Sequence, residues 1–104
     1  MAAVAIATAL SATAATALAD TERGNTLAAV CAGCHAPGTA AASVTETFPN
    51  IWGLNELALR QRLLDYQQDL GAPTLMNRIA KGYTEEELTL IAAAIAAVAP
   101  EEQP

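Results

Sequence analysis

Apolar residues recur at helical spacing in residues 21–33, 55–70 and 85–99, which predicts a helix in each stretch. The middle helix has the clearest limits, because Asn55 is a preferred N-cap residue and Gly71 is a typical C-terminal stop. Its apolar face is supplied by Leu57, Leu63, Leu64, Tyr66 and Leu70. We therefore expect this helix to pack along one broad apolar face.

Local signals complete the helical pattern. Residues 84–87 read Thr-Glu-Glu-Glu, a capping box that predicts the start of the last helix, and Pro100 predicts its end. A short helical turn is expected at 75–80, and the small and polar residues of 36–49 predict a loop. No stretch alternates apolar and polar residues, so we predict no strands. The predicted fold class is all-α, with about four helices.

The first nineteen residues carry no charge, and a small-x-small triplet at 17–19 precedes Asp20. This pattern is typical of a secretory signal peptide. We therefore divide the chain into a signal peptide, residues 1–19, and one domain, residues 20–104, which is exported to the periplasm and has no membrane span after cleavage. The usual basic residue near the start of a signal peptide is missing, so an uncleaved membrane anchor remains the alternative.

Charge and composition narrow the function further. Eleven acidic residues against five basic ones give a formal net charge of -6. Such a domain is a poor nucleic-acid binder, because phosphate backbones select basic surfaces. Alanine supplies much of the hydrophobic fraction of 53%, and aromatic residues make up only 4%. A small domain with so few large side chains has a weak core, which a large apolar cofactor would supplement.

One motif carries the candidate chemistry. Residues 31–35 read Cys-Ala-Gly-Cys-His, the C-x-x-C-H signature of covalent haem attachment. Two intervening residues allow the thiols of Cys31 and Cys34 to reach two vinyl groups on one edge of a porphyrin. His35 then lies under the iron as its proximal ligand, with a neutral imidazole. The motif predicts one covalently bound haem c.

Three other interpretations of the cysteines compete with haem attachment. An exported protein permits a simple disulfide. A thioredoxin-like redox pair needs a strand–helix–strand context, which the pattern does not predict. A structural zinc site needs four ligands, whereas the chain has two cysteines and one histidine. All three of these residues lie inside the haem motif, so haem attachment accounts for each of them.

The second axial ligand follows by elimination. The single histidine excludes bis-histidine ligation, and Met76 is the only methionine after the predicted signal peptide. Its thioether, in a loop that follows Pro73, would close the distal face of the haem and raise the reduction potential. Lys81 is a weaker candidate for this position. The structural alternative is that Met76 is an ordinary core side chain.

The chain resembles class I c-type cytochromes over nearly all of residues 20–100. Residues 24–27, Gly-Asn-Thr-Leu, look like part of the family's first helix. Residues 49–54, Pro-Asn-Ile-Trp-Gly-Leu, are similar to its P-N-L-x-G-L segment. The resemblance implies a cytochrome c-like fold around the haem, and it assigns to Pro49 the carbonyl that accepts a hydrogen bond from the proximal histidine. The last helix has Ala94 where relatives often place an aromatic residue.

A closer resemblance lies in residues 76–83, Met-Asn-Arg-Ile-Ala-Lys-Gly-Tyr. They are similar to a stretch in the cytochrome subunits of flavocytochrome c sulfide dehydrogenases, which dock on an FAD-containing flavoprotein. This implies a one-haem electron-transfer subunit, without a catalytic site of its own, that accepts electrons from FAD. Its expected contact surface includes Ala32, Gly33 and the methionine loop, with Arg78 and Lys81 as polar contacts. A free carrier between other redox proteins is the alternative, and a haem-free thiol protein is a third.

Overall fold

The computed structural model describes residues 2–35 and 48–98, with side chains from residue 12 onwards. The helices, in chain order, are α1 (Ala2–Ala28), the 3-10 helix η1 (Ala29–Gly33), α3 (Glu56–Gln67), α4 (Leu75–Ala80) and α5 (Glu85–Ala96). The described residues contain no β-strand. The prediction of an all-α fold with about four helices is therefore confirmed, and the arrangement is compatible with a cytochrome c-like fold.

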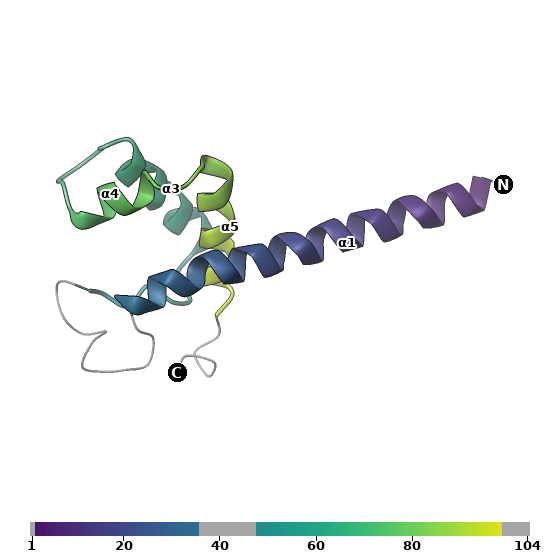
Figure 1. The fold of residues 1–104 in the computed structure, drawn as a ribbon, viewed down its shortest axis with the longest axis horizontal. Coiled ribbons are helices and arrows are strands. Elements are labelled where there is room, and N and C mark those ends of the chain that lie inside the picture. The colour runs from purple at the N-terminus through teal and green to yellow at the C-terminus, as the bar shows by residue number, and fades with distance from the viewer. Residues whose placement is uncertain (1, 36–47, 99–104) are drawn as a thin grey trace.

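Helix α1 is one continuous helix, and its N-terminal part extends away from the other helices (Figure 1). The helix predicted over 21–33 is present as the end of α1 followed by η1. In the full chain α1 begins earlier, because the alanine-rich residues before 21 have high helix propensity and include no breaker. The predicted cleavage point after Ala19 lies inside this helix, and cleavage itself stays a prediction. None of the helices in the described part of the chain is both long and apolar enough to cross a membrane.

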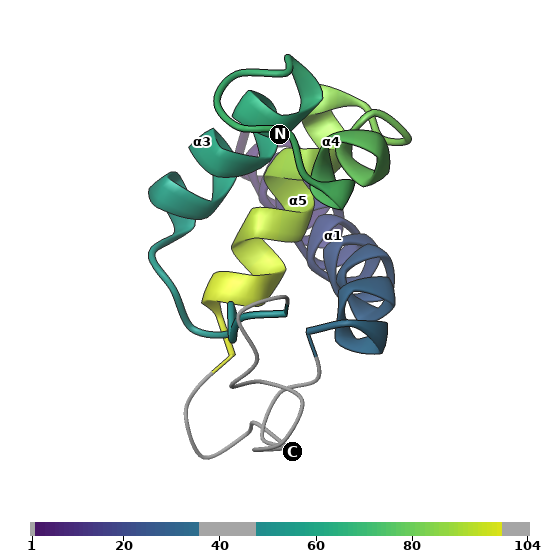
Figure 2. The ribbon, with the colours of Figure 1, turned by 90° about the vertical axis from the view of Figure 1, so that its left-hand side faces the viewer.

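Helix α5 lies between α1 and α3, and α4 packs against α3 (Figure 2). At the crossing of α1 and α5, a Cβ at the buried Gly24 would lie 2.7 Å from the carbonyl oxygen of Leu90. Only a glycine allows the two backbones to approach this closely. The buried core beside the crossing consists of Ala28, Leu59, Leu88, Ile91, Ala92 and Ile95. This core lies mostly on α5 and holds the three longer helices together.

Helix α3 begins as predicted, because the Asn55 side chain accepts a hydrogen bond from the N–H of Ala58 at 3.0 Å. Its apolar face matches the prediction only in part. Leu57 is 71% exposed and Leu70 is 55% exposed, whereas Leu59, which the prediction did not include, is buried. The packing against α5 selects this face, and Leu57 lies two residues from Leu59 on the far side of the helix.

The C-terminal end of α3 also differs from the prediction. The helix ends at Gln67, three residues earlier than expected. Asp69 has a φ of 58°, and its N–H and that of Leu70 donate back to the carbonyls of Tyr66 and Asp65. This is the Schellman arrangement, in which a left-handed residue closes the helix. Asp69 therefore takes the position that the sequence assigned to a glycine.

Capping boxes begin both remaining helices. Thr74 and Asn77 form the box of α4, and Thr84 and Glu87 form the predicted box of α5. Helix α4 has the predicted bounds, whereas α5 ends at Ala96, three residues before the predicted end. Residues 36–47 of the predicted loop, and the predicted helix stop at residue 100, lie outside the described residues.

Candidate functional site

Cys31, Cys34 and His35 lie in the turn that follows α1. The N–H groups of Cys34 and His35 both donate to the carbonyl of Cys31, at 3.2 and 2.8 Å. These bonds keep the motif within one tight turn. Both cysteines are free thiols, of which Cys31 is half-buried and Cys34 is exposed. The turn therefore presents two thiols and one imidazole at the end of a helix that the core holds in place.

The environment of the thiols argues against one of the competing interpretations, the thioredoxin-like redox pair. Burial raises the pKa of the Cys31 thiol, and Cys34 acts in the same direction. A raised pKa is the opposite of what a thioredoxin-like nucleophile needs, because the thiolate is the reactive form. Within residues 12–35 and 48–98, no group of three or more His, Cys, Asp or Glu side chains could hold a metal ion such as zinc.

His35 is held by contacts from the segment that begins at Phe48. Its Nδ1 lies 2.7 Å from the carbonyl oxygen of Pro49. A carbonyl only accepts hydrogen bonds, so this contact requires a proton on Nδ1. In the neutral imidazole, the lone pair of Nε2 is then free to bind a metal. The indole N–H of Trp52 donates to the backbone carbonyl of His35. The ring of Phe48 lies edge-on to the imidazole, with centroids 6.2 Å apart.

Sequence reasoning identified Pro49 but missed the two aromatic residues beside His35. The signal that could have found them is their place in the chain, since Phe48 and Trp52 stand on either side of Pro49. Gly53 anchors this segment to α5, because its N–H donates to the carbonyl of Ile95 at 3.0 Å. Its φ of 82° favours glycine at this turn. The core thus determines where Pro49 and Trp52 meet His35.

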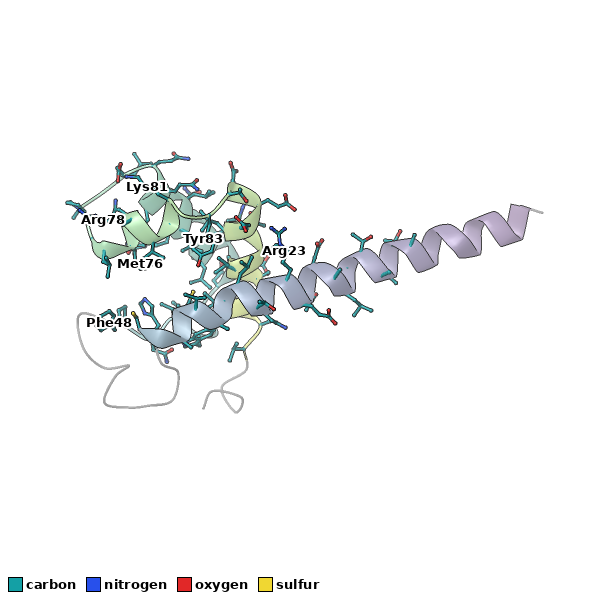
Figure 3. The ribbon with its side chains drawn as sticks, in the orientation of Figure 1. Arg23, Phe48, Met76, Arg78, Lys81 and Tyr83 are labelled. Atoms are coloured by element: carbon teal, nitrogen blue, oxygen red, sulfur yellow. The ribbon has the colours of Figure 1, made fainter. Side chains whose placement is uncertain are left out.

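Met76 occupies the first turn of α4 and is half-buried. Its backbone N–H donates to the hydroxyl of Thr74 at 3.1 Å. Figure 3 shows Met76 on the side of α4 that is nearer to Phe48 and the end of α1. The structure therefore places the predicted sixth ligand on an element separate from the cysteines and His35, on the side that faces them.

Lys81, the other candidate ligand, lies on the opposite side of α4 (Figure 3). Its amino group forms an ion pair with Asp69, with 2.5 Å between Nζ and Oδ2. The second carboxylate oxygen of Asp69 accepts a hydrogen bond from the Asn77 side chain at 3.0 Å. The hydrogen bonds from Lys81 and then Asn77 hold the pKa of Asp69 below its ordinary value. Met76 and Lys81 thus do not share a face of the helix.

Among curated proteins, the chain is 40% identical over 70 residues to the "Cytochrome subunit of sulfide dehydrogenase" of Chlorobaculum tepidum. The match covers 67% of this chain and 61% of that protein, so the chain spans less than two thirds of its relative. No family model and no solved structure gives a significant match. The similarity confirms the resemblance to this kind of cytochrome that was inferred from the sequence.

Proposed function

We propose that this chain is a one-haem electron-transfer protein, exported to the periplasm, that serves as the cytochrome subunit of a sulfide-oxidising flavocytochrome. The observation that carries the proposal is the turn of Cys31, Cys34 and His35, with the imidazole Nδ1 bound to the carbonyl of Pro49. The similarity to a cytochrome subunit of sulfide dehydrogenase supports the same function.

The donor set fits a haem c. Two free thiols at C-x-x-C spacing suit two thioether links. In each link the sulfur bonds to one vinyl carbon and the thiol hydrogen moves to the other, so no oxidant is needed. His35, through Nε2, and Met76, through its thioether, would hold the haem iron. The bound haem would supply a one-electron couple between ferric and ferrous iron.

The protein's own groups would orient and tune this couple. The hydrogen bond from His35 Nδ1 to Pro49 fixes the tautomer and the orientation of the ring, and it makes the imidazole a more basic ligand. Trp52 holds the backbone of the same residue. The soft thioether of Met76 would favour ferrous iron and so raise the reduction potential. Because His35 and Met76 would both hold the iron, electron transfer would be favoured over chemistry on a small bound molecule.

The proposed partner is a flavoprotein. Sulfide oxidation releases electrons in pairs, and a flavin accepts two electrons and passes them on singly. A flavoprotein needs close access to the haem edge near the thioether links. At Gly33 a Cβ would meet no atom within 4 Å, so this position leaves room for a partner. Arg78 is exposed and forms no ion pair in the described part of the chain, unlike Lys81. Arg78 is therefore the better candidate for a docking contact.

Covalent haem attachment is tested by mass spectrometry of the denatured, exported protein. We expect the mass of one added haem, retained after acid–acetone extraction, and a chain that begins at Asp20. Cys34→Ala should lose one thioether link, whereas Gly33→Ala, inside the same motif, should retain both. Haem that is extracted from the unsubstituted protein would contradict the proposal.

The flavoprotein partner is tested by gel filtration of protein from its native periplasm. A haem peak at the size of a larger complex, with flavin absorbance and little dependence on salt, is expected of a permanent subunit. A haem peak at the size of the isolated domain, without flavin even at low salt, would instead establish a free carrier. Such a carrier should bind its partners at rates that fall steeply as salt rises.

A further inference from the structure

The side chain of Asp69 connects the end of α3 to α4. Both of its oxygens are engaged, Oδ1 by the Asn77 amide at 3.0 Å and Oδ2 by the Lys81 amino group. Its backbone has a φ of 58°, which few residues other than glycine adopt at low cost. Asp and Asn tolerate this region better than most residues, and only a carboxylate can accept from both neighbours at once.

A continuous series of hydrogen bonds leads from Asp69 to Met76. Asn77 is only 6% exposed, and its Oδ1 accepts from the backbone N–H of Thr74 at 2.8 Å. The hydroxyl of Thr74 accepts from the backbone N–H of Met76 at 3.1 Å. Without the carboxylate, the amide N–H of the buried Asn77 would lack its acceptor, which destabilises the first turn of α4. The ion pair with Lys81 contributes less, because both of its side chains are about half exposed.

The same contacts keep the two candidate iron ligands apart. An α-helix turns by about 100° per residue, so Lys81 points about 140° away from Met76, five residues before it. This separation lasts only while α4 remains helical and docked on α3. The ion pair with Asp69 draws the amino group towards α3, away from the side that Met76 occupies (Figure 3).

We propose that Asp69 is a positioning residue for the sixth ligand, which fixes Met76 through Asn77 and Thr74 and keeps the Lys81 amine from competing with it. This inference rests on the proposed function, in which Met76 binds the haem iron. Asp69 itself would not touch the haem.

The test uses competition with imidazole in the ferric, haem-loaded protein. Asp69→Gly removes both acceptors but keeps the left-handed backbone accessible. Asp65→Ala is the matched control, because it removes one carboxylate from the same helix end. Among the described residues, the Asp65 side chain bonds only to Gln61, within α3. We expect imidazole to displace Met76 at about tenfold lower concentration in Asp69→Gly, in line with the loss of one buried hydrogen bond. The control should change by less than about twofold.

Two further variants separate the two parts of the proposal. A bond between the Met76 sulfur and ferric iron gives a weak long-wavelength absorption band. Asp69→Asn keeps an acceptor for Asn77 but loses the ion pair, so it should weaken this sulfur–iron band only by freeing Lys81 to replace Met76. Lys81→Ala in that background should restore the band. An imidazole affinity that is unchanged in Asp69→Gly, or changed equally in Asp65→Ala, would overturn the positioning role. A band that Lys81→Ala fails to restore would overturn the competing role of Lys81.

A second readout keeps this inference distinct from the proposed function. Unsubstituted protein that lacks the sulfur–iron band would contradict the assignment of Met76 as ligand, whatever Asp69 does. Amide hydrogen exchange in α4 then tests directly whether the hydrogen bonds of Asp69 stabilise this helix. We expect exchange about tenfold faster in Asp69→Gly than in Asp65→Ala. Equal exchange in the two variants would overturn the inference even if Met76 proved to be a ligand.

Discussion

The crossing of α1 and α5 and the short helix α4 are held in different ways. At the crossing, Leu88 and Ile91 of α5 are each 1% exposed, and the backbones touch at Gly24. On α4, Leu75 is 59% exposed and Ile79 is 37% exposed. The buried residues of α4 are Asn77 and Ala80. Apolar burial holds the crossing, whereas polar contacts from neighbouring segments hold α4.

The two kinds of contact have different consequences for the rigidity and the orientation of the helices. Burial is non-directional and stabilises the helix whose end leads into the turn of Cys31, Cys34 and His35. Hydrogen bonds depend on direction, so the contacts at Asp69 and Asn77 determine how α4 presents its side chains. Segments with few buried apolar contacts open locally at lower free energy than the core. We therefore expect α4 to open before the crossing does.

The largest expected effect is on the free energy of unfolding, and a comparison of two leucine variants tests it. Leu88→Ala should lower the free energy of unfolding by about 2–5 kcal/mol, because it leaves a cavity in the core. Leu75→Ala should cost less than about 1 kcal/mol, because its side chain is mostly exposed. Urea unfolding of the haem-loaded protein measures both. Similar losses in the two variants would show that α4 depends on apolar packing after all.

The next comparison uses two glycines. Gly24→Ala introduces a Cβ only 2.7 Å from the carbonyl oxygen of Leu90, so the helices must move apart. We expect a loss of about 1–3 kcal/mol from this crowding, even though alanine favours the helix. Gly33→Ala meets no atom within 4 Å and should leave stability nearly unchanged. Thermal unfolding of the two variants decides whether close approach of the backbones defines the crossing.

A smaller loss of stability is expected at Trp52, which lies between the core and His35. Trp52→Phe keeps a ring but removes the N–H that donates to the His35 carbonyl, which should cost about 1 kcal/mol. Amide exchange of the Cys-His turn should also become faster. Tyr83→Phe is the control, because its hydroxyl has no hydrogen bond with the described residues. Equal losses in the two variants would contradict a specific role for the indole N–H.

The smallest expected effect concerns pH at the crossing. The backbone N–H of Thr84, ahead of weaker contributions from its hydroxyl and from Arg23, holds the pKa of Glu87 below its ordinary value. The folded protein thus favours the ionised form. The Glu87 carboxylate therefore stabilises the fold at pH values above the ordinary glutamate pKa. This contribution is lost as the pH falls through the lowered pKa of Glu87 in the folded protein. Unfolding midpoints between neutral and acid pH should depend less on pH in Glu87→Gln than in Glu86→Gln.

Local patterns in the sequence predicted a large part of this molecule. The C-x-x-C-H turn, the Asn55 cap and the capping box at Thr84 each involve residues within four positions of one another. Such contacts form in the same way wherever the helix lies. The all-α fold and the bounds of α4 follow from the same local signals. The similarity to a cytochrome subunit was visible in residues 76–83.

Contacts between distant parts of the chain were decided by the tertiary structure. Packing against α5 buries Leu59 instead of Leu57, and no periodicity in α3 distinguishes the two. Asp69 takes the left-handed position ahead of Gly71 because α4 provides partners for its carboxylate. The same ion pair holds Lys81 on the side of α4 away from Met76. The sequence by itself determined which thiol and imidazole groups the protein has for the proposed haem attachment. Only the tertiary structure decided how they face one another, because that depends on where the core places each helix.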